Sequence, residues 1–422
     1  MNITIVTPTA ETSAIGRISR LLREALVTYG HSCTLLSGAT SSDNGTASNG
    51  HHTEQHIGIL ATSDIIIYQV GDHYGWHGDM LRWYKTYPGI ICLHDFVLEH
   101  LWEGYTKNNN YPNGDYEIID QLRKRTINNT EKNRAEDKKV QPSPLTEMFA
   151  SFALGVYTHS AWGIRPILEN CPGPVWVFPL CHPKRRLPGH KHNAKSVERK
   201  DSNIRLLTFG NIIANKQVKQ IIESIAADTK LSGQVSYRVV GLIEAEILLR
   251  FRQRVAELGL DVIFTGEVSD EALDAELRIA DVVIALRWPT LEAGSASVIE
   301  ALWNGKPTIV TDAGCYRDLP DDVVIKVSPV DQAHQLSTAL LSLLNHPEKR
   351  YELGIRAQSF ATSEFDPHLY GGRVAEFCEL VLQKSFAMRA GMAMTRQLGE
   401  WGMPIHHDAA LNAIAEKLSV FK

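Results

Sequence analysis

Two glutamates, Glu292 and Glu300, stand eight residues apart and flank a run of small side chains. The hydropathy pattern predicts a strand that ends near residue 286, a loop that carries Glu292 and a helix that begins near Ser297. Backbone N–H groups at a helix start carry partial positive charge, and small side chains let a phosphate approach them. We therefore expect a diphosphate at the residues of this run, which are Gly294, Ser295, Ala296 and Ser297.

Each glutamate then has its own expected partner. Glu300 lies about one turn inside the predicted helix, where its carboxylate would accept hydrogen bonds from a ribose diol beside the diphosphate. Glu292 lies on the loop side and would bind sugar hydroxyls. The alternative is that one carboxylate caps the helix and the other is a solvated helix position. That alternative leaves the run of small residues unexplained.

The elements that must position these residues follow one pattern in both halves of the chain. In the first half we expect strands at 3–6, 33–36, 65–70, 89–93 and 156–158, with helices at 15–29 and 78–84. In the second half we expect strands at 205–209, 236–240, 262–265, 282–285 and 308–311, with helices at 218–226, 245–258, 270–279 and 297–304. Further helices are expected at 331–344, 348–361 and 367–386. Such alternation is typical of parallel sheets covered by helices.

We therefore predict an α/β fold with two Rossmann-like, doubly wound domains and C-terminal helices. The length agrees, because 422 residues exceed what one hydrophobic core normally supports. The expected first domain is 1–182, with polar insertions at 40–55 and 105–142. A basic linker at 183–202, a second domain at 203–385 and a helical tail at 386–422 follow. Ligands of such sheets bind outside the carboxyl ends of the strands, so we expect the domains to face each other across a cleft.

Composition excludes several classes of protein. Hydrophobic residues at 44% and charged residues at 22% match an average globular protein. The net charge of -5 gives no basic field for nucleic acid. Six scattered cysteines without a C-x-x-C pair indicate neither a zinc site nor a disulfide framework. With neither a signal peptide nor a spanning apolar run, we expect a cytoplasmic protein whose basic linker is a candidate peripheral contact with the inner membrane face.

The glutamate pair and its context resemble the E-x7-E signature of retaining glycosyltransferases of GT-B architecture, the large family four. In that family a Gly-Arg pair and a following lysine, after the first strand of the second domain, bind the donor diphosphate. The matching run here has Gly210, then Asn211 in place of the arginine, then Lys216. The resemblance implies that the second domain binds the donor and that Lys216 contacts phosphate. Arg287, just before the glutamate loop, is our candidate for the second cation.

Matches in the first half imply the acceptor-side domain. Gly16 resembles a glycine turn below the donor sugar, where the family usually has two adjacent glycines. His94 and Asp95 resemble a strand-terminal His-Asp pair whose histidine approaches the donor sugar. We expect Asp95 itself to cap a helix that starts at Phe96.

A further group of side chains follows a predicted strand end at residue 71 and provides the acceptor candidates, which are Asp72, His73 and Trp76. No spacing typical of metal ligands accompanies them. The resemblance likewise implies that neither a metal nor another cofactor is used.

The implied activity is retaining transfer of a hexose or related sugar from a nucleoside-diphosphate sugar, with His94, Lys216 and Glu292 as catalytic residues. The acceptor would be a glycan, a lipid-linked or a small molecule, in polysaccharide or glycoconjugate biosynthesis. Two alternatives stay open because Asn211 and the single Gly16 depart from the family pattern. One is a nucleotide-sugar-binding subunit without turnover, and the other is an epimerase of the same architecture. A dinucleotide dehydrogenase is disfavoured because G-x-G-x-x-G is absent after the first strand.

Overall fold

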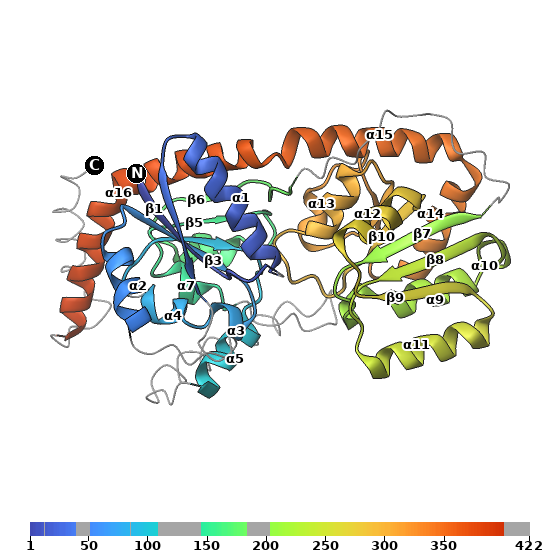
Figure 1. Cartoon of the computed structure of the whole chain (residues 1–422), viewed down its shortest axis with the longest axis horizontal. Helices are drawn as coiled ribbons and strands as arrows, with labels where there is room; N and C mark the ends of the chain where they lie inside the picture. Colours follow the sequence, from blue (N-terminus) through green and yellow to red (C-terminus); the bar gives the residue numbers. More distant parts are fainter. Residues whose placement is uncertain (12, 39–50, 85, 109–144, 184–202, 401–422) are drawn as a thin grey trace. The chain divides into compact units, whose positions relative to one another are not determined.

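The computed structural model of the chain describes residues 1–11, 13–38, 51–84, 86–108, 145–183 and 203–400. The chain forms two compact units (Figure 1). The first unit combines Met1–Pro179 with Pro367–Lys422, and the second is Leu180–Asp366. Each unit contains one parallel six-stranded sheet with helices on it, so the predicted α/β class with two Rossmann-like domains is confirmed.

The sheet of the first unit has the strand order β2-β1-β3-β4-β5-β6, and all of its pairings are parallel. Its strands are β1 (Asn2–Thr7), β2 (Ser32–Ser37), β3 (Ile65–Val70), β4 (Ile90–Leu93), β5 (Gly155–Thr158) and β6 (Val175–Val177). The helices described in this unit are α1 (Ala14–Thr28), α2 (His51–Ala61), α3 (Tyr74–His77), α4 (Met80–Trp83), α5 (Glu99–Asn108), α7 (Glu147–Ala150), α8 (Arg165–Asn170) and α16 (Pro367–Glu400). The central strands β3, β4 and β5 are buried along their whole length, as expected for apolar, β-branched runs covered on both faces.

The sheet of the second unit has the order β12-β11-β10-β7-β8-β9 and is also parallel. Its strands are β7 (Ile204–Phe209), β8 (Val235–Val240), β9 (Asp261–Gly266), β10 (Val282–Ala285), β11 (Thr308–Thr311) and β12 (Ile325–Val327). Its described helices are η1 (Ala214–Lys216), α9 (Val218–Ala226), α10 (Thr229–Gln234), α11 (Ala245–Leu258), α12 (Asp270–Ile279), α13 (Ala296–Trp303), η2 (Gly314–Asp318), α14 (Gln332–Asn345) and α15 (Pro347–Glu364). Apolar side chains from β7, β8, β10, α9 and α14 form its main core.

The helix α1 shows how sequence fixes a helix start. Ser13 has extended backbone angles and its hydroxyl accepts a hydrogen bond from the Gly16 backbone N–H, 3.1 Å away, which satisfies one of the unpaired donors of the first turn. A Cβ at Gly16 would lie 2.3 Å from the carbonyl oxygen of Pro8, so the close approach of the preceding loop requires glycine. Gly16 therefore lies in the first turn of α1, within the helix that we expected at 15–29.

The domain boundary expected at 385 is wrong, because the last described helix belongs to the first unit. Asp366 ends the second unit, and Pro367 begins α16, which in Figure 1 is the red helix that runs along the blue and green elements. Tyr370 and Phe377 of α16 pack on Tyr157 of β5, with ring centroids 6.5 and 5.9 Å apart. A Cβ on Gly371 would lie 2.3 Å from the Cβ of Ala25 in α1, so the two helices touch there.

Three further expectations can be compared with the structure. Asp95 does not cap a helix at Phe96, since the next helix, α5, begins at Glu99, and the Asp95 carboxylate instead accepts the Asp72 backbone N–H at 2.9 Å. The expected insertions and linker fall largely on 39–50, 109–144 and 184–202, and most of the expected tail falls on 401–422, all outside the described residues. Among the described residues, no helix is both long enough and apolar enough to cross a membrane.

Candidate functional site

The predicted donor residues lie at the carboxyl ends of three neighbouring strands of the second unit. β11, β10 and β7 are adjacent in the sheet, and the segments that follow them carry η2, the Arg287 to Glu292 loop and η1, respectively. One small pocket is lined by Lys216, Arg287 and Ser297 together with residues of β7 and β10. The sequence argument placed these three side chains at a common phosphate site, and the structure brings them together.

Lys216 is a buried cation, only 4% exposed, at the end of η1. Its Nζ donates a hydrogen bond to the carbonyl oxygen of Phe209, the last residue of β7. Burial, and then the positive charge of Arg287, hold the pKa of the Lys216 amine well below its usual range, while Glu292 acts in the opposite direction. A charged ammonium here lacks water, so an anion in the pocket would be a strong partner for it.

The turn before η1 requires glycine at two positions. Gly210 has φ +93°, and a Cβ on it would lie 2.8 Å from the Lys216 Nζ. Gly241, after β8, has φ +133°, and its Cβ would lie 2.1 Å from the Gly210 carbonyl oxygen. Two chain segments thus cross with backbone against backbone directly beside the lysine. Asn211, which replaces the family's arginine, is exposed at this turn.

Arg287 and Glu292 form an ion pair, with Arg287 Nε 3.2 Å from Glu292 Oε1 and side chains only 17% and 16% exposed. The same Oε1 accepts a hydrogen bond from the Tyr316 hydroxyl at 2.5 Å. Arg287 Nη1 donates to Asn215 Oδ1 at 3.1 Å. The guanidinium and the carboxylate are therefore fixed by side chains from η1 and η2, that is, from the ends of both neighbouring strands.

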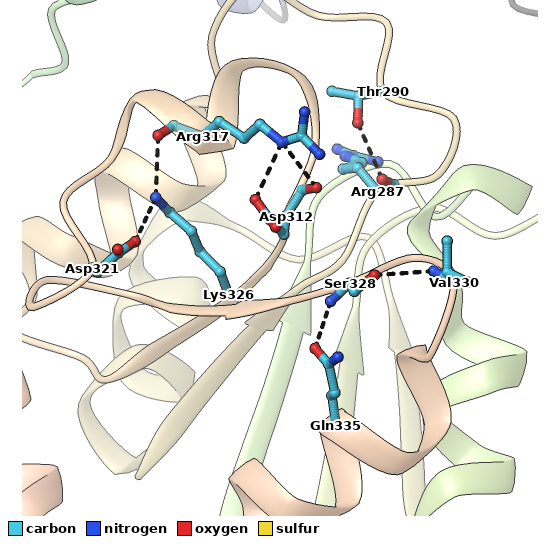
Figure 2. Close-up of polar contacts among 9 residues, drawn as sticks. All are labelled: Arg287, Thr290, Asp312, Arg317, Asp321, Lys326, Ser328, Val330 and Gln335. Atoms are coloured by element: carbon cyan, nitrogen blue, oxygen red, sulfur yellow. Dashed lines mark hydrogen bonds and ion pairs between the residues drawn. The ribbon is translucent and has the colours of Figure 1, made fainter. Parts of the chain in front are cut away.

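The backbone of this loop is tied down as well. The Arg287 N–H donates to the Thr311 hydroxyl at 2.8 Å. The Thr290 hydroxyl donates to the Arg287 carbonyl oxygen at 3.3 Å (Figure 2). Gly314, with φ +56°, packs against Thr290 so closely that a Cβ would lie 2.3 Å from Thr290 Cγ2. The loop is thus held against β11 and η2 in one conformation.

Figure 2 also shows a second polar region, around the ends of β11 and β12. Its cations are engaged internally: Arg317 pairs with Asp312 at 3.2 Å, and Lys326 pairs with Asp321 at 2.7 Å. These two ion pairs hold the loops of the unit together. Arg317 and Lys326 do not line the pocket that contains Lys216, Arg287 and Ser297, and we place the candidate site at that pocket.

The helix α13 starts at the run of small residues. Ala296 is its first residue and Ser295 its cap, and the hydroxyls of Ser295 and Ser297 lie 3.2 Å apart. Gly294 and these residues are all partly exposed, so a ligand can reach the backbone N–H groups. Glu300 lies in the same helix and is only 8% exposed. The alternative in which Glu300 is a solvated helix position is therefore wrong.

His94 of the first unit is buried at the end of β4, and its environment is a network of neutral partners. Its Nε2 lies 2.6 Å from Gln69 Oε1, and Gln69 in turn donates to the Tyr157 hydroxyl at 3.2 Å. Burial, and then His159 and His77, hold the pKa of His94 well below its usual range. The imidazole is therefore neutral near pH 7 and acts as a hydrogen-bonding group.

The Sγ of Cys92 completes this cluster, 3.6 Å from His94 Nε2 and 3.5 Å from His159 Nε2. Three groups of the kind that bind metals thus lie within 4.8 Å of one another. Each also has a hydrogen-bond partner within the protein, since His159 Nδ1 lies 3.3 Å from the Phe178 carbonyl oxygen. The cluster is complete as a hydrogen-bonded network, and its His94 nitrogen is already committed to Gln69.

The acceptor candidates occupy different environments. Asp72 accepts the Leu101 backbone N–H at 2.9 Å and pairs with His100 at 2.7 Å, so it fixes the start of α5. His73 is exposed beside α3, and its ring lies 6.1 Å from that of the half-buried Trp76. These two rings remain candidates for a sugar contact, whereas Asp72 has a structural partner on each oxygen.

The sequence argument missed Tyr316 and Asn215, which hold Glu292 and Arg287. Asn215 could have been identified from the sequence, because it directly precedes Lys216. Tyr316 lies 24 residues beyond Glu292, and only the three-dimensional adjacency of β10 and β11 brings it there.

Comparison with known proteins shows similarity in part of the sequence and in the fold. Residues 190–360 match the family model "Glycosyl transferases group 1". The fold is similar to sucrose-phosphate synthase from Thermosynechococcus elongatus, at 17% identity and a TM-score of 0.61, over 89% of this chain and 98% of that one. It is also similar to HepE from Anabaena in complex with UDP, at 14% identity and a TM-score of 0.62, over 90% and 100% of the two chains.

A third similar structure is WaaG, a glycosyltransferase involved in lipopolysaccharide biosynthesis, with 13% identity, a TM-score of 0.55 and coverage of 90% and 99%. None of the curated proteins matches the sequence. The chain thus has the two-sheet GT-B fold, and its residues 190–360 match the group 1 glycosyltransferase model.

Proposed function

We propose that the protein transfers a sugar from a nucleoside-diphosphate sugar to an acceptor with retention of anomeric configuration. The observation that carries the proposal is the convergence of Lys216, Arg287 and Ser297 on one pocket at the start of α13. Two cations and a helix start are suited to a diphosphate leaving group. HepE was solved in complex with UDP and with UDP-glucose, which supports a donor of this class.

Lys216 and Arg287 then stabilise the charge that builds on the diphosphate as its bond to the sugar breaks. Glu300, buried in α13, accepts hydrogen bonds from the ribose, and Glu292 from the sugar. His94 is proposed as a neutral partner for a sugar hydroxyl. These roles need charge and hydrogen bonding only, so we propose turnover without a divalent metal or other cofactor.

For the chemical step we propose attack by the acceptor oxygen on the same face of the sugar from which the diphosphate departs. The bond from the anomeric carbon to the phosphate oxygen breaks as the bond to the acceptor oxygen forms. The acceptor proton passes to the departing phosphate oxygen, which balances the charge. A glycosidase-like double displacement would instead need two carboxyl groups about 5 Å apart around the anomeric carbon.

The acceptor is proposed to be a glycan, a lipid-linked or a small molecule in polysaccharide or glycoconjugate biosynthesis. A cytoplasmic location, with peripheral contact to the inner membrane face through the basic linker, fits a lipid-linked acceptor. WaaG, which has the same fold, is involved in lipopolysaccharide biosynthesis.

The test uses uridine, guanosine and adenosine diphosphate sugars with wild-type protein and with Glu300→Ala. Calorimetric titration identifies the bound nucleotide, and mass spectrometry detects transfer to added acceptors or slow donor hydrolysis. Loss of a charged acceptor for buried hydroxyls should weaken nucleoside diphosphate binding by about 1.5 to 3 kcal/mol. Asn304 contacts only the Glu300 backbone oxygen, so this contact survives the change.

The matched control is Glu352→Ala, a glutamate 64% exposed on α15. It should leave both binding and turnover unchanged. Wild-type protein that binds a sugar nucleotide but neither transfers nor hydrolyses it would point to the binding-subunit alternative. Conversion of the donor into a different sugar nucleotide would point to an epimerase.

A further inference from the structure

The Glu292 carboxylate is shared between two groups that have different roles in the site. One oxygen, Oε1, faces both the Arg287 guanidinium and the Tyr316 hydroxyl. Arg287 lines the pocket with Lys216, whereas Tyr316 is almost fully buried in η2. The cation that would serve a phosphate is therefore engaged by the carboxylate that would serve a sugar.

We propose that Glu292 and Arg287 form a carboxylate–guanidinium switch that couples recognition of the donor sugar to recognition of the diphosphate. A bare diphosphate must compete with Glu292 for the guanidinium. When sugar hydroxyls donate to Glu292, the carboxylate is satisfied and Arg287 turns to the phosphates. The inference rests on the proposed function and extends it, because it makes this pair the residues that distinguish a sugar nucleotide from the nucleoside diphosphate left after transfer.

Tyr316 lowers the free-energy cost of separating Glu292 from Arg287. A largely buried carboxylate that loses the guanidinium paired with it would be strongly disfavoured. The Tyr316 hydroxyl stays on Oε1 at 2.5 Å when Arg287 departs, so Glu292 keeps a donor in either arrangement. Tyr316 is thus a positioning residue that acts through Glu292.

Asn215 limits how far Arg287 can move. Its Oδ1 accepts from Arg287 Nη1 at 3.1 Å, next to Lys216 in the same η1 turn. The guanidinium can therefore exchange its Nε contact with Glu292 for a phosphate contact while it remains beside the lysine. In this exchange the guanidinium replaces one anionic partner by another, so Arg287 keeps a charged partner in both states.

The experiment measures binding of inorganic pyrophosphate by calorimetry, a probe that has neither base nor sugar. Glu292→Gln keeps the shape of the side chain and the acceptor for Tyr316 but removes the charge that competes for Arg287. We expect about five- to tenfold tighter pyrophosphate binding, of the order contributed by one partly exposed charge-assisted contact. The sugar nucleotide that the wild-type protein prefers should bind more weakly to the same variant.

The gain must depend on Arg287, so the same substitution is made in an Arg287→Gln background. A switch predicts that the gain disappears there, whereas a general reduction of negative charge predicts that it persists. Glu246→Gln, which removes an exposed Arg–Glu pair on α11, is the matched control and should change nothing. Thermal unfolding of each variant verifies that it is folded.

The inference is overturned if Glu292→Gln binds pyrophosphate no more tightly than wild type, or if the gain survives without Arg287. Its failure is separate from that of the proposed function, because donor transfer by wild-type protein is measured independently. Tyr316→Phe adds a second readout: kcat should fall several-fold more than KM changes, since Glu292 loses its fixed position in the transition state. If Tyr316 had a purely structural role, Tyr316→Phe would lower thermal stability without a larger effect on kcat than on KM.

Discussion

At the scale of single residues, the amine of Lys216 is a buried group whose pKa lies well below its usual range. Burial and the Arg287 guanidinium both favour the neutral amine, and the Phe209 carbonyl oxygen accepts its hydrogen bond. An incoming diphosphate favours the charged ammonium and so raises the pKa of Lys216 again. Between the lowered pKa of the free protein and the raised pKa of the complex, binding must take up a proton.

We therefore predict that nucleoside diphosphate binding above about pH 8, clear of the phosphate pKa near 6, is accompanied by uptake of up to about one proton. Affinity should fall as the pH rises through the pKa of the complex. Titrations in buffers of different ionisation enthalpy measure the uptake. Lys216→Gln should abolish it, while Lys219→Gln, an exposed lysine on α9, should not. An observed enthalpy that is independent of the buffer would contradict this prediction.

At the same scale, sequence reasoning predicted that two side chains lie close together but did not predict their contacts. Lys216 and Arg287 were expected at one site, and both line one pocket. Spacing along the chain did not predict that Arg287 would pair with Glu292, because a side chain of that length can reach several partners on neighbouring loops. Side-chain rotamers, set by packing against η1 and η2, decide among them.

At the scale of elements, strands were easier to predict than helix ends. Apolar, β-branched runs such as β3 and β10 have few other stable environments than a covered parallel sheet. The start of α5 was misplaced because Asp95 has the chemistry of a helix cap but is used by the Asp72 backbone instead. Local sequence shows that a capping residue is present, but a competing tertiary partner determines what it binds.

Gly16 allows a test of packing at the start of α1, because the neighbouring loop leaves no room there for a larger side chain. A Cβ at Gly16 would approach the Pro8 oxygen to 2.3 Å, whereas a Cβ at Gly58 of α2 would meet nothing within 4 Å. Gly16→Ala should destabilise the first unit by about 1 to 3 kcal/mol through overpacking. Gly58→Ala should be neutral or stabilising by up to about 1 kcal/mol, because alanine is the better helix former.

Denaturant unfolding, monitored by hydrogen exchange in β1 and β3, measures both effects. Equal stability of the two variants would show that the loop at Pro8 yields easily. In that case the glycine would serve the ligand and not the packing.

At the scale of the whole molecule, the chain forms most of the first unit, then the whole second unit, and then adds a last helix to the first unit. Sequence did not predict the return, because an amphipathic pattern indicates that a helix buries one face but not which sheet it covers. The buried side chains of α16, which include Tyr370, Val374, Phe377 and Val381, lie in the first unit's core. A helix assigned to the second domain by its position in the chain is therefore part of the first.

Phe377→Ala tests this assignment. Phe377 is fully buried, with its ring 5.2 Å from Trp176 and 5.9 Å from Tyr157, so its truncation should cost about 3 to 5 kcal/mol. The loss should appear as faster hydrogen exchange in β5 and β6, with β7 and β8 unchanged. Leu382→Ala, on an exposed part of α16, should cost under about 1 kcal/mol. Faster exchange in β7 and β8 would contradict the division into units.

The path of the chain also fixes an order of events on the ribosome. After Pro179 has been made, the first sheet must wait for the whole of Leu180–Asp366 before the helix that covers β5 can exist. At about 5 to 20 residues per second this delay lasts roughly 10 to 40 s. During this delay the nascent first unit exposes apolar surface, while the second unit can already fold. We therefore expect the first unit to depend more on chaperones than the second.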